Sequence, residues 1–277
     1  MFSRFSNSWK LVQASASVLR ADKELIVFPI LSTIGVVIVS ASFIVPIALS
    51  GRAEQLDDSP LGFALAFLFY LATYFVIFFC NSALVGAAMI RLRGGDPTVG
   101  DGLKIAFNHI GPIFGYALLS ATVGMILRAL TQRAGLLGRI VISLVGIAWN
   151  VATFLAVPIL VTEKIGPIAA VKRSAALLKK TWGEQAIGNG GLGLVFGLII
   201  FGVIFAGAGL IFLAAQAGSG PVIFAVVAIV VFVVAALAIL NATLSSIYTA
   251  AVYLYAAEGS TGSMFQPAQI QGAFRQK

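Results

Sequence analysis

QAIGNGGLGLVFGLIIFGVIFAGAGLIFLAAQAGSGPVIFAVVAIVVFVVAALAILNATLSSIYTAAVYLYAA, from Gln185 to Ala257, is a run of 73 residues without one Asp, Glu, Lys, Arg or His. A soluble domain needs charge on its surface, whereas about 20 apolar residues are enough to cross a bilayer. The segment Gln216-Ala-Gly-Ser-Gly-Pro221 interrupts the run, which therefore predicts two spans joined by a short turn. We expect an integral membrane protein.

The composition of the whole chain supports this expectation. Hydrophobic residues make up 60% and charged residues 10%, with a mean hydropathy of +1.02, far from the averages of soluble domains. A length of 277 residues suits one polytopic membrane domain. In a soluble protein the net charge of +8 would suggest nucleic acid. Here it predicts basic cytoplasmic loops and anionic membrane lipids as partners, and no nucleic acid.

Uncharged apolar runs predict an all-α protein with six membrane spans. The second and sixth exceed a minimal crossing, so we expect tilt or protrusion beyond the bilayer. The first is too long for a signal peptide and suits a retained span. The six runs are Leu25–Ser50, Leu61–Ile90, Ile110–Leu127, Ile140–Val161, Ala186–Ala215 and Val222–Ala257.

The distribution of Lys and Arg predicts the orientation. With the N-terminus inside, the cytoplasmic segments hold 14 of these residues and the outer loops hold four. Basic residues are retained on the cytoplasmic side. We therefore expect both termini in the cytoplasm and a multi-pass protein of the cytoplasmic (inner) membrane of a prokaryote.

A segment with helical apolar periodicity precedes each odd-numbered span. Such segments predict amphipathic elbow helices in the headgroup layer, or ordinary cytoplasmic helices that pack on the bundle. In the third segment, the candidate lipid-facing basic residues are Lys172, Arg173, Lys179 and Lys180. Pro97 and Pro167 stand where the second and third segments can start as helices. The apolar positions are Phe2, Phe5, Trp9, Val12, Ala16 and Leu19, then Val99, Leu103, Ala106 and Ile110, then Ile168, Val171, Ala175, Leu178 and Trp182.

Each even-numbered span contains one asparagine: Asn81, Asn150 and Asn241. With the elbow segments, they suggest a threefold internal repeat of units 1–96, 97–166 and 167–258, followed by a tail, 259–277. An amide without a partner is costly inside a membrane, so these side chains should face the bundle interior. There they either line a polar path or hold helices together, and the lack of accompanying charge favours interhelical contacts.

Arg128, Arg133 and Arg139 form an outer basic cluster with no acidic residue nearby in sequence. Guanidinium groups suit phosphate oxygens, so the cluster is a candidate site for an anion or a lipid headgroup. The alternative is that these side chains reach from helix ends to water, or pair with the acidic residues Glu54, Asp57 and Asp58 of the first outer loop.

Other motifs give no sign of catalysis. Gly188-Asn-Gly190-Gly-Leu-Gly193 matches a dinucleotide fingerprint in letters but lies before a membrane span instead of within a βαβ unit. His109 is the only histidine and lacks companions at metal-ligand spacing. The single cysteine, Cys80, is expected to be a buried thiol. We therefore expect no enzyme activity, no cofactor and no metal.

One stretch resembles a known family: Glu163-Lys-Ile-Gly166-Pro167-Ile-Ala-Ala-Val-Lys172-Arg173-Ser174, with Leu178-Lys179-Lys180-Thr181-Trp182. Arg91-Leu-Arg-Gly-Gly95-Asp96-Pro97 supports the likeness. The chain resembles uncharacterised six-span membrane proteins of bacteria and archaea that form a domain of unknown function. This family is distantly similar to the membrane portion beside some glycerophosphodiester phosphodiesterases. The resemblance implies a helical membrane protein and transfers no catalytic residue.

The function expected from the sequence is non-enzymatic: a structural, assembly or lipid-interacting role in the membrane. The alternative is a channel or uncoupled transporter for a small solute or anion, with the asparagines along its path and the outer arginines at its mouth. Glycine-rich helix faces also make association with a second copy or with other membrane proteins a reasonable expectation.

Overall fold

The computed structural model describes residues 2–51, 59–182, 191–216 and 220–260, together with residues 262, 265 and 270, and these residues form helices and connecting turns without a strand. In this part of the chain six helical segments are long and apolar enough to cross a membrane. They confirm the six spans predicted from the sequence. Their bounds are Lys23–Ser50, Pro60–Leu92, Ile110–Arg133, Leu136–Thr162, Val195–Gln216 and Gly220–Glu258.

The spans contain helices α2 (Val27–Ser50, after the 3-10 turn η1, Lys23–Ile26), α4 (Pro60–Leu92), α6 (Ile110–Arg133), α7 (Leu136–Ala152) with α8 (Ala156–Thr162), α10 (Gly191–Gln216) and α11 (Gly220–Glu258). Three further helices each precede a span. They are α1 (Phe2–Ala21), α5 (Val99–Asn108) and α9 (Pro167–Trp182).

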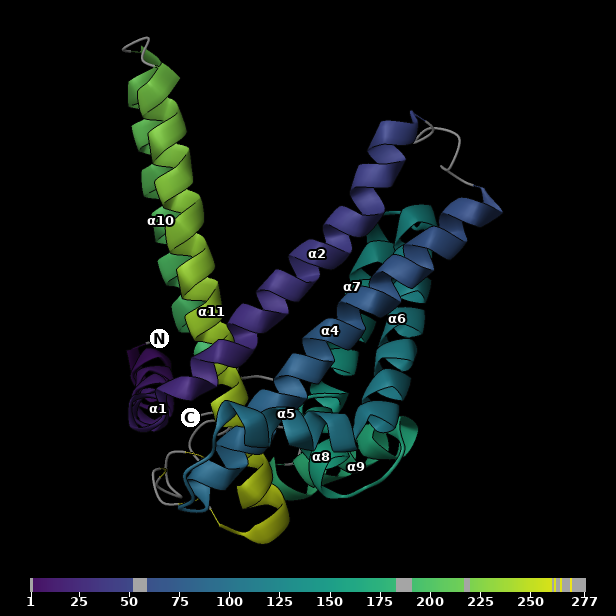
Figure 1. Cartoon of the computed structure of the whole chain (residues 1–277), viewed down its shortest axis with the longest axis vertical. Coiled ribbons are helices and arrows are strands. Elements are labelled where there is room, and N and C mark those ends of the chain that lie inside the picture. Colours follow the sequence, from purple (N-terminus) through teal and green to yellow (C-terminus); the bar gives the residue numbers. More distant parts are fainter. Residues whose placement is uncertain are drawn as a thin grey trace.

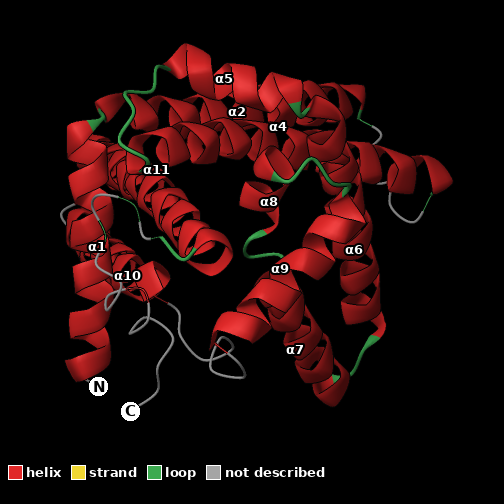
Figure 2. Ribbon diagram, turned by 90° about the horizontal axis from the view of Figure 1, so that it is seen from below, coloured by secondary structure: helices red, strands yellow, loops and turns green. Residues whose placement is uncertain are grey.

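The buried core lies at one end of the molecule, which we call the base. It joins the C-terminal parts of α4 and α11 to α8, and α1, α5 and α9 pack around them. Figure 1 shows these elements together at the lower end, and Figure 2 shows them from below. Leu84, Leu92, Leu160, Ile247 and Leu254 are among the fully buried side chains. The base therefore stabilises the fold as the core of a soluble domain would.

Away from the base the helices diverge as hairpins, which we call the arms. The α10–α11 hairpin rises on one side and the α2–α4 hairpin on the other, with α6 beside α4 and α7 beside α6 (Figures 1 and 2). The most apolar 18-residue windows of α2 and α11 contain no fully buried residue, although several of their side chains are half-buried. Within the arms, α10 packs on α11, and α4 packs on both α2 and α6.

Helices α4 and α11 contain 33 and 39 residues, which corresponds to about 50 and 58 Å of helix. The hydrocarbon core of a bilayer is only about 30 Å thick. Their length confirms that the second and sixth spans exceed a minimal crossing. Most of the surplus is in the buried ends, such as Ala83–Leu92 of α4, that build the base.

The fourth span is broken, whereas the sequence suggested one continuous run. Helix α7 ends at Ala152 and α8 begins at Ala156. Pro158 has no N–H to donate to a helical hydrogen bond, and its ring would clash with the carbonyl group of Phe154, four residues earlier, in a continuous helix. The break is stabilised from outside, because the hydroxyl of Ser174 on α9 accepts a hydrogen bond from the buried backbone N–H of Leu155 at 3.0 Å.

Replacing Ser174 with alanine should destabilise the protein by about 1–3 kcal/mol, because the buried Leu155 N–H would lose its acceptor. The midpoint of thermal unfolding in detergent measures this loss. Ser17→Ala is the matched control, since the Ser17 hydroxyl only donates to the Ala14 carbonyl of its own helix. Equal midpoints for the two variants would show that the break does not depend on Ser174.

The faces that α1, α5 and α9 bury differ in part from the predicted stripes. On α9 the buried residues are Ala170, Ser174, Leu177 and Leu178, while Ile168 stays 61% exposed. Helix α1 buries Leu11, Val12, Ala14, Ser15 and Val18, and leaves Trp9 exposed; α5 buries Gly102 and Ala106. The protein-facing sides of α1 and α9 thus mix small residues with Leu and Val, whereas that of α5 consists of small residues that allow close packing on the base.

Candidate functional site

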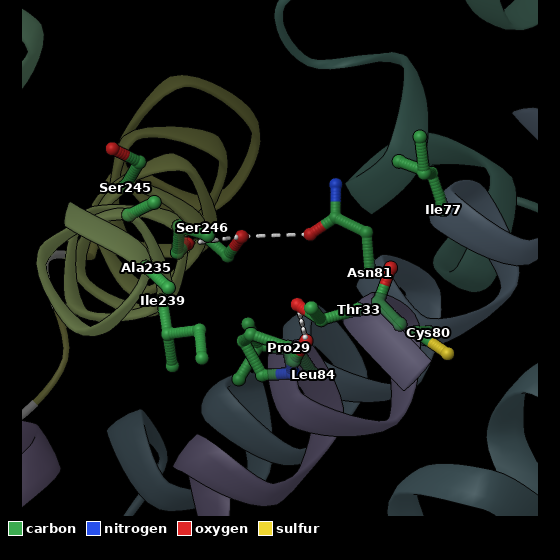
Figure 3. A pocket seen from close by; sticks show the side chains of 13 residues that line it. Pro29, Thr33, Ile77, Cys80, Asn81, Leu84, Ala235, Ile239, Ser245 and Ser246 are labelled. Atoms are coloured by element: carbon green, nitrogen blue, oxygen red, sulfur yellow. Dashed lines mark hydrogen bonds between the residues drawn. The ribbon is translucent and has the colours of Figure 1, made fainter. Parts of the chain in front are cut away.

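A cavity of about 440 Å³ lies between α2, α4 and α11. Figure 3 shows it from close by. Thirteen uncharged residues line it: Pro29, Ser32, Thr33, Ile77, Cys80, Asn81, Leu84, Ala235, Ala238, Ile239, Ala242, Ser245 and Ser246. Its size falls in the range of small-molecule sites, which are mostly apolar with a few polar groups.

Local packing creates this space. Helices α2 and α4 approach closely at Gly35, where a Cβ atom would lie 2.7 Å from Cγ1 of Val76. The side of α11 that faces the cavity projects little into it, because Ala235, Ala238 and Ala242 carry only methyl groups. Small side chains on α11 thus leave room that larger side chains would fill.

The polar groups of the cavity come from all three helices. The Ser246 hydroxyl lies 2.7 Å from Oδ1 of Asn81 and 2.9 Å from the Ala242 carbonyl oxygen (Figure 3). The Thr33 hydroxyl donates to the Pro29 carbonyl at 2.8 Å. Among the described residues, the amide nitrogen of Asn81 and the hydroxyl of Ser32 have no protein partner. The cavity therefore combines one interhelical hydrogen bond with unused hydrogen-bonding capacity.

Cys80 lies in the wall of the cavity and is buried, as the sequence predicted. His109 ends α5, and its Nδ1 is 2.8 Å from the Ile105 carbonyl oxygen. No group of three His, Cys, Asp or Glu side chains able to hold a metal ion occurs within the described part of the chain. The Gly188–Gly193 motif lies largely outside the described residues.

The structure does not bring the three asparagines together. Asn81 bonds to Ser246 on α11, and Asn241 accepts a 3.4 Å hydrogen bond from Ser245 on its own helix. Asn150 is exposed on α7, which packs on α6 and α9. Asn81 joins two helices and lines the cavity, whereas Asn150 does neither.

The outer arginines lie at the end of the molecule opposite the base. Nη1 of Arg128 donates a 2.6 Å hydrogen bond to the hydroxyl of Tyr70 on α4. Arg133 and Arg139 stand exposed on either side of the turn between α6 and α7. Their candidate partners Glu54, Asp57 and Asp58 lie outside the described residues.

The basic residues of α9 divide into two kinds. Lys172, Lys179 and Lys180 are exposed. Nε of Arg173 instead pairs with Oε2 of Glu163 at 3.1 Å, and Oε1 of Glu163 accepts a hydrogen bond from the Tyr253 hydroxyl of α11. Arg173 therefore connects α9 to α11 at the base, while the three lysines are open to a partner.

Sequence reasoning identified Asn81 but missed the hydroxyl residues that surround it. Two polar pairs inside apolar runs were the available signal: Ser32-Thr33 in the first span and Ser245-Ser246 in the sixth. Such pairs often return hydrogen bonds to their own helix, as Thr33 does, so their spacing alone does not distinguish a cavity wall from a lipid-facing surface.

Residues 60–264 match the family of unknown function DUF6159, and the chain belongs to that family. Comparison with curated proteins and with solved structures found no match.

Proposed function

We propose that this member of the DUF6159 family is a non-enzymatic, multi-pass membrane protein that interacts with lipids. Its base faces the cytoplasm, both termini lie on that side, and the membrane is the inner membrane of a prokaryote. The excess of Lys and Arg in the segments that connect at the base supports this orientation. The basic surface of α9 supports anionic lipids as partners.

One observation carries the lipid-interacting role: the most apolar windows of α2 and α11 contain no fully buried residue. The two arms that contain them diverge from the base (Figure 1). Exposed apolar surface must be covered, and between membrane-spanning arms the available material is acyl chains. Lipid is therefore expected to fill the wedge between the arms.

Helices α1, α5 and α9 fit the role of elbow helices in the headgroup layer. Each stands at the base directly before a span, and Trp9 and Ile168 remain 44% and 61% exposed. Apolar side chains beside exposed lysines suit the boundary between headgroups and acyl chains. The threefold repeat and the similarity to the membrane portion beside some glycerophosphodiester phosphodiesterases belong to the same proposal.

Anionic lipid should stabilise the protein through α9. We expect phosphatidylglycerol to raise the midpoint of thermal unfolding in detergent more than phosphatidylcholine does. The double variant Lys172→Gln/Lys179→Gln should lose most of this difference, because each basic residue near an anionic surface contributes about 1 kcal/mol.

The charge-matched control is Arg133→Gln/Arg139→Gln, which removes the same charge from the other candidate headgroup site, at the opposite end of the molecule. A full phosphatidylglycerol effect in the α9 variant, or an equal loss in the control, would contradict the role of α9. An ion-flux assay in liposomes tests the alternative of a channel or uncoupled transporter. The proposal expects no flux above protein-free liposomes, and a flux abolished by Asn81→Leu would favour the alternative.

A further inference from the structure

We propose that the cavity between α2, α4 and α11 binds the uncharged glycerol-ester end of a neutral diacyl lipid, that is, a diacylglycerol, whose acyl chains extend between the arms. This inference deepens the lipid-interacting role and rests on it. It assigns one lipid class to one site, distinct from the basic surface of α9.

The depth of the cavity in the membrane fits ester groups. Asn81 stands 21 residues after the first residue of α4, and Asn241, one turn before Ser245, stands 21 residues after the first residue of α11. At 1.5 Å per residue, both lie about 30 Å from the outer ends of these helices. Measured along the helix axes, that distance is close to the hydrocarbon thickness, and the tilt of the diverging arms shortens it across the bilayer. The cavity therefore lies in the base-side part of the membrane, near the polar ends of lipids.

The chemistry of the wall selects an uncharged group. All thirteen lining residues are neutral, and a phosphate placed among them would lose water without gaining a cation. The amide N–H groups of Asn81 and the hydroxyl of Ser32 can donate hydrogen bonds, and the hydroxyl oxygen of Ser245 can accept one. An ester carbonyl accepts and a free glycerol hydroxyl donates, so a diacylglycerol end complements both kinds of group.

The surroundings provide for two acyl chains. Above the cavity, α2 exposes Ile34, Val37 and Ile38, each at least 51% exposed, and α11 exposes Val231 and Phe232 at 62% and 74%. These surfaces belong to the two arms that diverge from the base (Figure 1). Acyl chains anchored at the cavity would cover apolar surface on both arms.

Native mass spectrometry of the delipidated protein in detergent tests the site. Parallel samples receive dioleoylglycerol or dioleoylphosphatidylglycerol. We expect one dioleoylglycerol per chain, and about tenfold weaker binding in Ser32→Leu and in Asn81→Leu, because each variant removes a donor and adds apolar bulk. Ser32→Leu leaves the Asn81–Ser246 hydrogen bond in place, so weaker binding by this variant cannot be caused by loss of that interhelical contact. Asn150→Leu changes the exposed asparagine of α7 and should bind like the wild type.

Three results would overturn the inference. Dioleoylglycerol binding that Ser32→Leu leaves unchanged would remove the site. Phosphatidylglycerol binding that is equally strong and equally sensitive to Ser32→Leu would remove the selection of a neutral lipid. A dimer mass that Ser32→Leu abolishes would assign the cavity to contact with a second copy. A different experiment tests the lipid-interacting role itself. If that role is wrong, phosphatidylglycerol will not raise the midpoint of thermal unfolding through Lys172 and Lys179.

Discussion

Replacing Gly102 with alanine should lower the free energy of unfolding by about 3 kcal/mol, whereas Gly100→Ala on the same helix should not lower it. A Cβ atom at Gly102 would overlap with Cζ of Phe28 and would lie 2.8 Å from the carbonyl oxygen of Ala83. A ring can rotate, but a carbonyl oxygen inside α4 moves only if the helix moves. The added methyl group would therefore force α5 away from α4 and α2 at the base.

Gly100 is the matched control because its surroundings are open. The nearest atom to a Cβ there is Oγ1 of Thr98, at 3.6 Å. Alanine favours helix over glycine by about 0.5–1 kcal/mol, so Gly100→Ala should be neutral or slightly stabilising. The measurement is the midpoint of thermal unfolding of each variant in detergent, with the size-exclusion profile as the readout of folded protein. Similar midpoints would show that α5 is not packed as tightly as the geometry indicates.

Arg91→Met should cost about 3 kcal/mol, because several groups at the base depend on this guanidinium. Nη1 donates to the Gly95 carbonyl and to Oδ1 of Asp96, and Nη2 donates to the Ala21 carbonyl at 3.1 Å. The side chain is 21% exposed. Arg91 thus joins the end of α4 to the turn after it and to the junction between α1 and the first span.

The loss in Arg91→Met should depend on pH. Burial raises the pKa of the Asp22 carboxyl, and the charge of Arg91 acts in the opposite direction. Removing Arg91 should raise this pKa further, so the native state of the variant binds a proton more readily than the unfolded chain. The destabilisation is therefore fully present above the raised pKa and decreases as pH falls through it. Unfolding midpoints measured from neutral to acidic pH test this direction.

Arg93→Met is the control for Arg91. The Arg93 side chain is 52% exposed and pairs with Glu258, which is 42% exposed. Exposed ion pairs contribute about 0–1 kcal/mol, so this variant should unfold close to the wild type at every pH. A pH-independent loss in Arg91→Met would show that Asp22 does not respond to this charge, and an equal loss in Arg93→Met would assign the effect to general charge removal.

The membrane spans could be predicted because their cause is local. Each span needs only its own run of apolar residues, because the backbone hydrogen bonds of a membrane helix are made within that helix. The break at residues 153–155 is different. Pro158 weakens the helix there, but the acceptor that makes a break acceptable is Ser174, on another helix, and no local pattern reveals that pairing.

The division into base and arms could not be predicted from hydropathy. Leu84 at the base and Ile38 on an arm are both strongly apolar, yet Leu84 is 1% exposed and Ile38 is 62% exposed. In a membrane both environments favour apolar side chains, because lipid and protein interior differ little in polarity. The small residues Gly86, Ala87 and Ala88 were the better signal of protein contact.

The candidate site was predictable in one residue only. Asn81 is an amide inside an apolar run, and such a group needs a partner. Its partner, Ser246, lies 165 residues further along the chain. The other hydroxyls bond to their own helices or stay free, so only the packing of α2, α4 and α11 shows that they share a cavity.

The separation between α4 and α11 also has a consequence for biosynthesis. Ribosomes add about 5–20 residues per second, so the 165 residues between Asn81 and Ser246 take roughly 8–33 s to translate. During that interval the small-residue face of α4 is in the membrane without α11 to cover it. Newly made chains should therefore be most vulnerable to membrane proteases before the last hairpin emerges, and stalling translation within α10 would leave the base unfinished.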